Sequence, residues 1–371
     1  MQSSQSALIQ LECLACGNAF NPDDLQTFCP DCSGPLLAVY DLPSARLTLT
    51  RESLTRRPAG LWRWNEILPV RAPAFQLTLG EAGTPLLKAS NLGGRLGLSE
   101  LYIKDESHGP LGSWHAREMA VSVARALELG VRDFTLAAVG SDGAALAAYA
   151  ARARARAHIY SSKSTPLPDQ VAITTLGAEL SLVDGPFSAV MEVAGRAAGL
   201  HGCLDLSVFK EPYRCEGIKS IGLELAEAFG WDLPDVIIVP GGTGLGPLGI
   251  WKAFLELEGL DFIGARRPRM IIVQSQGWQA EYTGPVGLYV PHILADRQIL
   301  RDLQASNGSA LAISDEEILV CQKEMAIFEG IFVGPQGAAC LAAARQLITA
   351  GTISRQERVV LINPDSGLNF L

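Results

Sequence analysis

Four cysteines near the start of the chain form the pattern that is most directly tied to chemistry. They occur as two C-x-x-C pairs, Cys13 with Cys16 and Cys29 with Cys32, separated by twelve residues. Each pair suits a tight turn that directs two sulfurs at one centre, and two such turns complete a closed tetrahedral site of four thiolates. A glycine follows each pair closely, where a turn needs backbone freedom. The spacing therefore predicts a structural zinc ribbon within residues 1–40.

Two disulfides, or a redox-active dithiol, are the alternative interpretations of this pattern. The cytoplasmic location inferred below disfavours disulfides, and a redox C-x-x-C normally stands alone at a strand-to-helix junction. A module of about forty residues buries too little apolar surface to fold alone, so zinc would supply much of its folding free energy. The remaining cysteines are scattered, and we expect them to be small buried hydrophobes: Cys203, Cys215, Cys321 and Cys340.

The composition of the 371-residue chain is that of a folded protein with more than one domain. Hydrophobic residues make up 48% and charged residues 19%, which is typical of a well-packed globular protein. Acidic residues outnumber Lys and Arg by 39 to 30, which argues against binding to nucleic acid or to an anionic membrane. No apolar run reaches membrane-spanning length, and the first ten residues lack a secretory-signal pattern. We therefore expect a cytoplasmic protein.

After an Arg-, Pro- and Trp-rich loop with a short helix near residues 44–75, short apolar runs alternate with longer segments rich in Ala and Leu. This alternation predicts βαβ units and parallel sheets. Ser314 followed by Glu317 is a capping-box signature for a helix start. We expect strands at 101–105, 133–139, 235–240, 269–275 and 358–363, and helices at 116–130, 143–157, 249–259 and 314–330.

The segment from Tyr102 to Arg117 reads YIKDESHGPLGSWHAR. It resembles the active-site segment of threonine synthases, which are pyridoxal-phosphate (PLP) enzymes of the tryptophan synthase β type. In that family the segment reads K-x-E-x-x-N-P-T-G-S-F-K-D-R, and its second lysine forms the Schiff base. Further matching motifs extend to Leu371: GEAGTPL at 80–86, GAALAAYAAR at 143–152, EPYRCEG at 211–217, VPGGTGLGPLGIWKAF at 239–254, EGIFVGPQGAA at 329–339 and LINPDSGL at 361–368.

The resemblance implies an α/β fold of the fold type II PLP-enzyme architecture. Two parallel-sheet α/β domains would enclose the site in the cleft between them, after a small N-terminal zinc ribbon. The implied large domain comprises residues 41–111 and 206–371, and the implied small domain comprises residues 112–205. The resemblance also implies a homodimer.

The positions that hold the cofactor in the family are altered in this chain. The Schiff-base lysine matches His115, and an imidazole cannot form the imine. The asparagine for the phenolic oxygen matches Ser141, a threonine of the phosphate loop matches Leu245, and the hydroxyl for the ring nitrogen matches Pro364. The matches therefore imply a scaffold that forms no PLP aldimine, so that PLP is absent or not covalently bound.

Other residues could replace part of the missing machinery. Lys104 and Lys219 are the candidates for another amine, but both match ordinary family positions away from the helix start that presents the nucleophile. We expect a small anionic metabolite to bind beside Arg117, Lys104 and a glycine loop whose backbone N–H groups form an anion site. Alternatively, the glycines only permit a tight turn and close helix packing. The predicted ligand-binding set is Arg117, Ser141, Asp142, Gly242, Thr243, Gly244, Gly246 and Ser366.

Two classes of function remain open at this point. In the first, His115 at a helix N-terminus has a lowered pKa and acts as a neutral base, with Ser113 and Lys104 as the other catalytic residues. The chemistry would be a PLP-independent elimination or addition on a phosphorylated or sulfonated acid. In the second, the protein is a non-catalytic ligand sensor, or a regulatory partner of an active relative, and His115 only fills space. The missing lysine disfavours a PLP-dependent threonine or cysteate synthase, and the position of His115 slightly favours the lyase.

Overall fold

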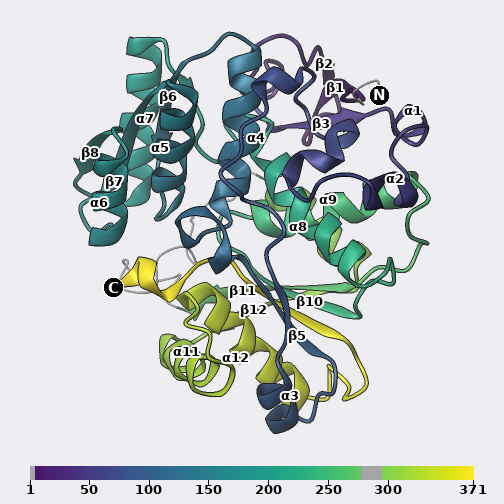
Figure 1. Ribbon diagram of the computed structural model, residues 1–371. Coiled ribbons are helices and arrows are strands. Elements are labelled where there is room, and N and C mark those ends of the chain that lie inside the picture. Colours follow the sequence, from purple (N-terminus) through teal and green to yellow (C-terminus); the bar gives the residue numbers. More distant parts are fainter. Residues whose placement is uncertain (1–4, 277–294) are drawn as a thin grey trace.

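The computed structural model describes residues 5–276 and 295–371, and the strands in these ranges form three sheets (Figure 1). The first sheet is antiparallel, and helices connect most strands of the other two. In spatial order, the sheets are β2 (Ala19–Phe20), β1 (Leu8–Cys13) and β3 (Leu36–Tyr40); β12 (Ser309–Ile313), β11 (Arg269–Ser275), β10 (Val236–Pro240), β13 (Val359–Asn363), β5 (Leu101–Asp105) and β4 (Leu86–Lys88); and β8 (Glu179–Val183), β7 (Arg156–Ser162), β6 (Asp133–Ala137) and β9 (Leu204–Asp205).

The six-stranded sheet is parallel except for its edge strand β4, and helices cover both of its faces. Successive residues of a strand point to opposite faces, so Ile237 and Val360 join one buried cluster while Val236 and Val359 join another. Burial on both faces explains why the central strands are continuous apolar runs. On one face lie α3 (Ser90–Leu96), α11 (Asp315–Glu329) and α12 (Pro335–Thr349), and on the other lie α8 (Arg214–Ala228) and α9 (Leu245–Gly259).

The four-stranded sheet is wholly parallel and is built from residues 133–205. These residues fall within the range that we expect for the small domain. The helices packed on this sheet are α5 (Asp142–Ala153), α6 (Leu167–Thr175) and α7 (Phe187–His201), shown in teal in Figure 1. Helix α4 (His115–Glu128) contacts both α5 and α8 and therefore joins this unit to the larger one.

The structure has the expected α/β class, with two parallel-sheet units and a small N-terminal sheet, and this part of the prediction is confirmed.

Short helices and one longer helix make the remaining connections. The connecting segments are α1 (Leu42–Ala45), α2 (Arg51–Thr55), η1 (Leu61–Ile67), η2 (Pro73–Phe75), η3 (Glu106–His108), η4 (Pro110–Gly112) and α10 (Asp296–Ala305), and η6 (Gly367–Phe370) is the last element of the chain.

One expected helix was extended too far. Helix α5 ends at Ala153, Arg154 adopts a left-handed conformation with φ of 52°, and β7 already begins at Arg156. The run ARARARA alternates with a period of two, which is a strand pattern, and Ala157 and Ile159 are indeed buried on one face of β7. The capping box at Ser314 is confirmed, because its hydroxyl and the Glu317 side chain each bond the other's backbone.

The four scattered cysteines are buried, as expected. In the two described ranges, no helix is both long and apolar enough to cross a membrane.

Candidate active site

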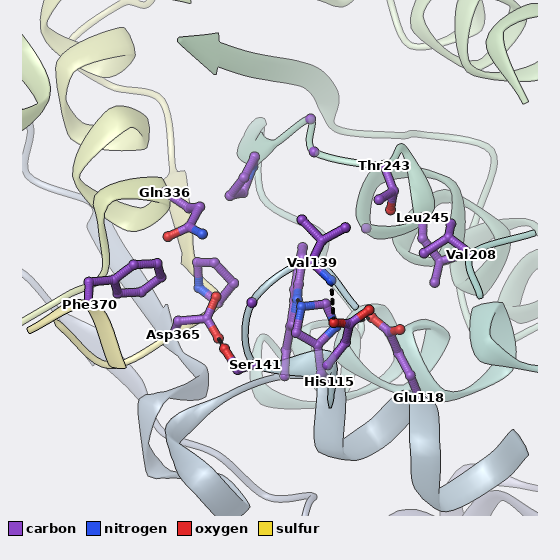
Figure 2. A pocket seen from close by; sticks show the side chains of 18 residues that line it. His115, Glu118, Val139, Ser141, Val208, Thr243, Leu245, Gln336, Asp365 and Phe370 are labelled. Carbon is purple, nitrogen blue, oxygen red and sulfur yellow. Dashed lines mark hydrogen bonds and ion pairs between the residues drawn. The ribbon is translucent and has the colours of Figure 1, made fainter. Parts of the chain in front are cut away.

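A pocket lies where segments following the carboxyl ends of strands from both parallel sheets meet (Figure 2). Such ends are the usual location of ligand sites in open α/β sheets. The hollow measures about 600 Å³, including the part that is open to solvent. Most of the residues that line it follow β6, β10 and β13 or begin α4, and Val208 after β9 and Gln336 at the start of α12 complete the lining.

His115 begins α4 and lines the pocket. Its position is set by the backbone, because Trp114 N donates to Pro364 O at 2.9 Å and His115 N donates to Ser113 Oγ at 3.2 Å. One helical turn later, Glu118 Oε1 lies 2.9 Å from His115 Nδ1. The other ring nitrogen, Nε2, is 3.4 Å from Trp114 Nε1, which is longer than an ordinary hydrogen bond. The imidazole is therefore held on one side by a carboxylate.

Glu118 belongs to a buried chain of alternating charges. Arg214 Nε donates to Glu118 Oε2 at 2.6 Å, and Arg214 Nη2 lies 3.2 Å from Asp142 Oδ2. The other oxygen of Asp142 accepts from Val139 N at 2.7 Å. Glu118, Arg214 and Asp142 each have side chains that are only 1% exposed. Because α4, α8 and α5 supply the three groups, the chain of charges ties α4 and α5 to α8.

The electrostatics of this cluster overturn one expectation. Burial opposes the charge on His115, but the carboxylates of Glu118, Asp142 and Asp365 outweigh burial and raise the pKa of His115 to about 9. The imidazole is therefore protonated at neutral pH, and the expected neutral base is wrong. Three carboxylates outweigh the helix N-terminus, whose partial charge alone would lower the pKa. Burial also opposes the charge on Glu118, yet Arg214 and His115 hold its pKa below the usual value.

Asp365 places a further carboxyl group in the pocket. It follows β13, pairs through its backbone with Ser113, and accepts a hydrogen bond from Ser141 Oγ at 3.1 Å. Burial raises the pKa of Asp365 above its ordinary value, although His115 and the two serine hydroxyls act in the opposite direction. The pocket therefore contains a cationic imidazole and a carboxyl group of increased basicity.

The glycine loop after β10 forms another part of the wall. Gly242, Thr243 and Gly246 line the pocket, and Gly242 and Gly244 have positive φ angles of 44° and 86°. A Cβ on Gly246 would lie 2.5 Å from Cη2 of Trp114, so the indole requires glycine there. Helix α9 begins at this loop, and the first N–H groups of a helix have no partner within it. The start of α9 therefore leaves backbone N–H groups without partners inside the helix, next to the pocket wall.

The other expected ligand-binding and catalytic residues separate into two groups. Ser141 and Asp142 line the pocket together with His115, whereas Ser113, Gly244 and Ser366 are not among its lining residues. Ser113 instead accepts the backbone N–H of His115. Ser366 accepts from Leu368 N at 3.3 Å and so caps η6.

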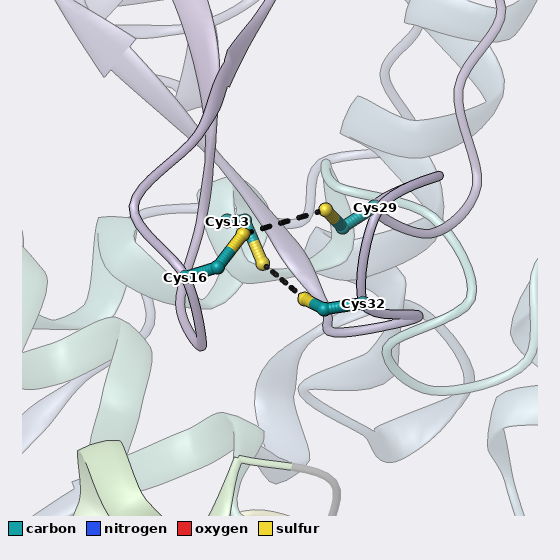
Figure 3. A group of neighbouring side chains, drawn as sticks. All are labelled: Cys13, Cys16, Cys29 and Cys32. Carbon is teal, nitrogen blue, oxygen red and sulfur yellow. Dashed lines mark hydrogen bonds between the residues drawn. The ribbon is translucent and has the colours of Figure 1, made fainter.

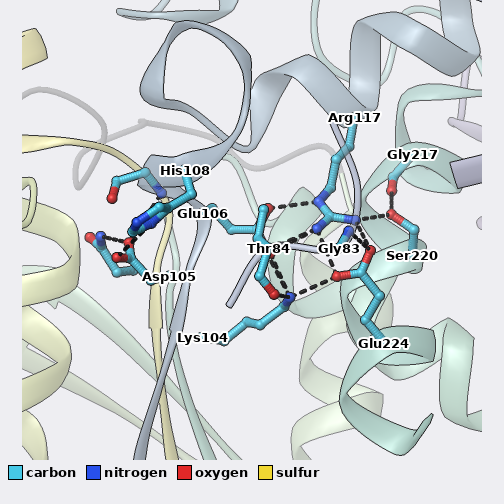
Figure 4. A network of polar contacts seen from close by, with 12 residues as sticks. Gly83, Thr84, Lys104, Asp105, Glu106, His108, Arg117, Gly217, Ser220 and Glu224 are labelled. Atoms are coloured by element: carbon cyan, nitrogen blue, oxygen red, sulfur yellow. Dashed lines mark hydrogen bonds and ion pairs between the residues drawn. The ribbon is translucent and has the colours of Figure 1, made fainter. Parts of the chain in front are cut away.

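Lys104 and Arg117 lie outside the pocket lining, so their expected role as anion ligands and the expected catalytic role of Lys104 are wrong. Figure 4 shows the network of polar contacts that holds them instead. Arg117 Nε donates to Glu106 Oε2 at 2.6 Å, and Arg117 Nη1 donates to Glu224 Oε1 at 2.7 Å. Lys104 Nζ donates to Glu224 Oε2 at 2.7 Å and to the backbone oxygen of Thr84 at 2.6 Å. Both cations are buried and paired with carboxylates, so they link α4, β5 and α8, and loss of either would leave a buried carboxylate without one of its partners.

Glu118, Arg214 and Asp365 are not predicted as site residues by the sequence patterns. The i, i+3 spacing of His115 and Glu118 on one helix could have revealed the first of these. Asp365 directly follows Pro364, a matched family position, and this neighbour could have revealed it. No local signal marks Arg214, because it contacts Glu118 and Asp142 from α8 through tertiary packing and does not itself line the pocket.

The four N-terminal cysteines converge, as a zinc ribbon requires (Figure 3). The Sγ atoms of Cys13 and Cys32 are 3.4 Å apart, those of Cys16 and Cys29 are 3.6 Å apart, and all four lie within 4.8 Å of one another. A Cβ on Gly34 would lie 2.9 Å from the sulfur of Cys13, so the turn needs glycine. The donor set and its geometry fit a tetrahedral zinc ion.

Comparisons with known proteins agree with this fold and site. The family described as pyridoxal-phosphate dependent enzyme matches residues 77–365. The chain is 33% identical to a threonine synthase of Methanocaldococcus jannaschii, covering 96% of this chain and 92% of that protein. It is 31% identical to a threonine synthase of Methanosarcina acetivorans, covering 96% and 91%. The chain therefore belongs to the pyridoxal-phosphate dependent enzyme family. Within this family it is a threonine synthase-like protein of fold type II.

Solved structures that share the fold are more distant in sequence. Maize serine racemase superimposes with a TM-score of 0.63 at 18% identity, covering 76% of this chain and 89% of that chain. Threonine deaminase isoform 2 of Solanum lycopersicum superimposes with a TM-score of 0.62 at 19% identity, covering 76% and 79%. These similarities concern the fold alone.

Family membership implies PLP, which requires a lysine at the pocket. All seven lysines of the chain lie in the described ranges, and none of them lines the pocket. Lys104 is engaged as described above, and Lys219 is buried against Glu216 and lies 2.8 Å from Glu256. His115, Leu245 and Pro364 line the pocket at matched family positions. The residues present do not fit a PLP held through a lysine Schiff base.

We expect Arg117→Met to lower the free energy of unfolding by about 3–5 kcal/mol, because Glu106 and Glu224 each lose a buried cationic partner and only Lys104 remains near them. Denaturant unfolding followed by circular dichroism measures this loss. Arg56→Met is the matched control, since the Arg56–Glu52 pair is exposed and such pairs contribute about 0–1 kcal/mol. An unchanged stability for Arg117→Met would return this residue to the candidate ligand-binding groups.

The same network predicts a pH dependence of stability. Burial opposes the charge on Glu224, but Arg117 and Lys104 lower its pKa to about 2. A depressed folded-state pKa stabilises the fold above the ordinary value of 4.5 and loses this effect as the pH falls toward 2. The stability difference between wild type and Arg117→Met should therefore shrink over this pH range.

Proposed function

We propose that this protein binds a small anionic acid in the pocket and catalyses lyase chemistry there without a PLP Schiff base. The observation that carries the proposal is the position of His115, whose Nδ1 lies 2.9 Å from Glu118 Oε1 in a pocket that no lysine lines, and the neighbouring carboxylates raise the pKa of this imidazole. The ligand class is a phosphorylated or sulfonated small acid, which the glycine loop suits. A non-catalytic ligand sensor, or regulatory partner of an active relative, is the second candidate.

The two ends of the pocket support such a ligand in different ways. At one end, Gly242, Gly246 and the start of α9 offer backbone N–H groups to an anion. At the other end, Glu118 and Asp142 line the pocket, and Arg214, which lies outside the lining, offsets their negative charges. Because Arg214 pairs with both carboxylates, the positive charge that the His115 imidazolium adds to the pocket does not face two unpaired negative charges.

An elimination would use two groups that face the pocket. Asp365, in its ionised form, takes a proton from the carbon next to the ligand's acid group. A carbon–carbon double bond forms as the leaving group departs with its bonding electrons, and His115 gives that group the proton from Nε2. Proton exchange with solvent then restores both residues. Ser141 holds the Asp365 carboxyl group through its hydroxyl, and Ser113 fixes the start of α4.

Replacing His115 tests the catalytic role. We expect His115→Gln to lower turnover about 10²- to 10⁴-fold, the usual contribution of a positioned acid or base. The assay screens phosphorylated and sulfonated amino acids and hydroxy acids, and follows both the unsaturated product and the released phosphate or sulfite. Because the pKa of His115 is about 9, wild-type turnover should fall as the pH rises through that value.

His108→Gln is the matched control, because the same side-chain change then falls on a residue that is 59% exposed and outside the pocket lining. Inorganic phosphate serves as the binding probe for all variants. Turnover lost with phosphate binding retained supports the lyase. Binding of phosphate to wild type without turnover on any compound of the panel would favour the sensor.

The relatives favour a different candidate, a PLP-dependent threonine synthase. We expect added PLP to give no visible imine absorption with the wild-type protein, and borohydride to fix no cofactor on it, because the amine is missing. The Methanocaldococcus jannaschii threonine synthase is the positive control. A borohydride-reduced PLP adduct on any lysine, identified by mass spectrometry, would refute our proposal.

A single His115→Lys change extends this test. We expect it not to restore threonine synthesis, since Ser141, Leu245 and Pro364 still differ from the family pattern. Measured threonine formation by this variant would show that the three other changes matter little.

We also propose that the four N-terminal cysteines bind one structural zinc ion. Cys16→Ser should reduce the zinc content by one equivalent per chain and lower the melting temperature, because the metal contributes folding free energy. Elemental analysis and thermal unfolding measure the two effects, with Cys321→Ala as a control at a buried cysteine outside the cluster. An unaltered zinc content would contradict this assignment. The cytoplasmic location and the homodimer also remain proposals, the latter open to sedimentation analysis.

A further inference from the structure

A second group of potential metal ligands lies at the amino end of the four-stranded sheet. Asp133 begins β6, His158 lies in β7, and Cys203 immediately precedes β9. The active-site pocket uses residues that follow β6 at its other end. The two sites are therefore separated by the length of a strand.

Strand register explains why these residues share one face of the sheet. His158 is the register partner of Thr135, two residues after Asp133, and Leu204 is the partner of Phe134. Because side chains alternate between faces, Asp133, His158 and Cys203 project to the same side. Glu179 is the partner of His158 on β8 and joins them.

The ligand atoms are close together. One oxygen, one ring nitrogen and the sulfur of Asp133, His158 and Cys203 lie within 4.8 Å of one another. His158 Nε2 is 3.0 Å from Asp133 Oδ1, and its Nδ1 is 3.0 Å from Glu179 Oε2. Cys203 is 9% exposed, and the side chains of His158 and Asp133 are 22% and 21% exposed. The group is sheltered yet accessible to an ion.

We propose that Asp133, His158 and Cys203 bind a divalent transition-metal ion, with Zn²⁺ as the best match. Zn²⁺ accepts carboxylate oxygen, imidazole nitrogen and thiolate sulfur, and with bond lengths of about 2.0–2.3 Å the ligands need only a small contraction. Three protein ligands leave one position for water. The ion would join the start of β6, the middle of β7 and the segment after α7.

The surroundings of His158 match those of metal-ligating histidines. Such histidines usually donate their second ring N–H to a carboxylate, which fixes the tautomer and the ring orientation. Glu179 is placed for this role, and the ring of His201 stacks on that of His158 with centroids 6.2 Å apart. Burial and Asp133 raise the pKa of Cys203 to about 11, so the metal would displace a thiol proton on binding.

The alternative is a polar ladder without a metal, by which we mean the hydrogen bonds and ion pairs that join Asp133, His158 and Glu179 across the strands. Arg156 also forms an ion pair with Asp133. The full-length protein is therefore saturated with Zn²⁺, freed of excess ion and measured by elemental analysis. We expect wild type to hold one equivalent beyond that of the cysteine cluster, and His158→Gln and Cys203→Ala each to lose it. His108→Gln and Cys321→Ala are the matched controls and should keep it.

Further measurements separate this site from the zinc ribbon and from misfolding. Co²⁺ substitution should give thiolate-to-metal absorption that Cys203→Ala reduces, while Cys16→Ser removes a different part of the spectrum. Glu179→Gln should weaken binding about 10- to 100-fold without removing a ligand. Because His158 is partly exposed, we expect His158→Gln to fold, and this variant tests the site even if Cys203→Ala unfolds. Equal metal content in wild type, His158→Gln and the controls would contradict the proposed metal site and would show that these residues form only the polar ladder.

Discussion

The pocket depends on the buried alternation of charge from His115 through Glu118 and Arg214 to Asp142. Removing Glu118 or Arg214 would leave a buried charge without its partner, which costs far more than the loss of an exposed pair. The alternation also makes His115 a cation, because the carboxylates of the cluster outweigh the cost of burial. The same buried charges therefore hold the helices around the pocket in place and raise the pKa of His115.

This arrangement gives a physical account of how the scaffold can differ from its relatives in chemistry. A family lysine would present a primary amine at the start of α4, whereas here an imidazole lies against a carboxylate that Arg214 already holds. Trp114 packs on Gly246, so the glycine loop and the helix start remain in contact. The fold persists because its sheets, helices and glycine turns do not depend on the amine.

Buried ion pairs in this protein have two different roles. Lys104 and Arg117 form a closed network with Glu106 and Glu224, and both cations lie away from the pocket. His115, in contrast, is 18% exposed and has one ring nitrogen free of a short hydrogen bond. Burial of the whole side chain, rather than the type of residue, separates a structural cation from one that is available to a ligand.

The sequence by itself determined the α/β class, the parallel strands, the zinc-type cysteine spacing and the loss of the family lysine. These depend on local patterns: apolar runs for buried strands, C-x-x-C turns for converging sulfurs, and a motif that aligns His115. Only the tertiary structure decided the protonation of His115, the removal of Arg117 from the pocket and the meeting of Asp133 with Cys203. Each of these depends on groups far apart in the chain, and the strength of an electrostatic interaction depends on distance and burial in space.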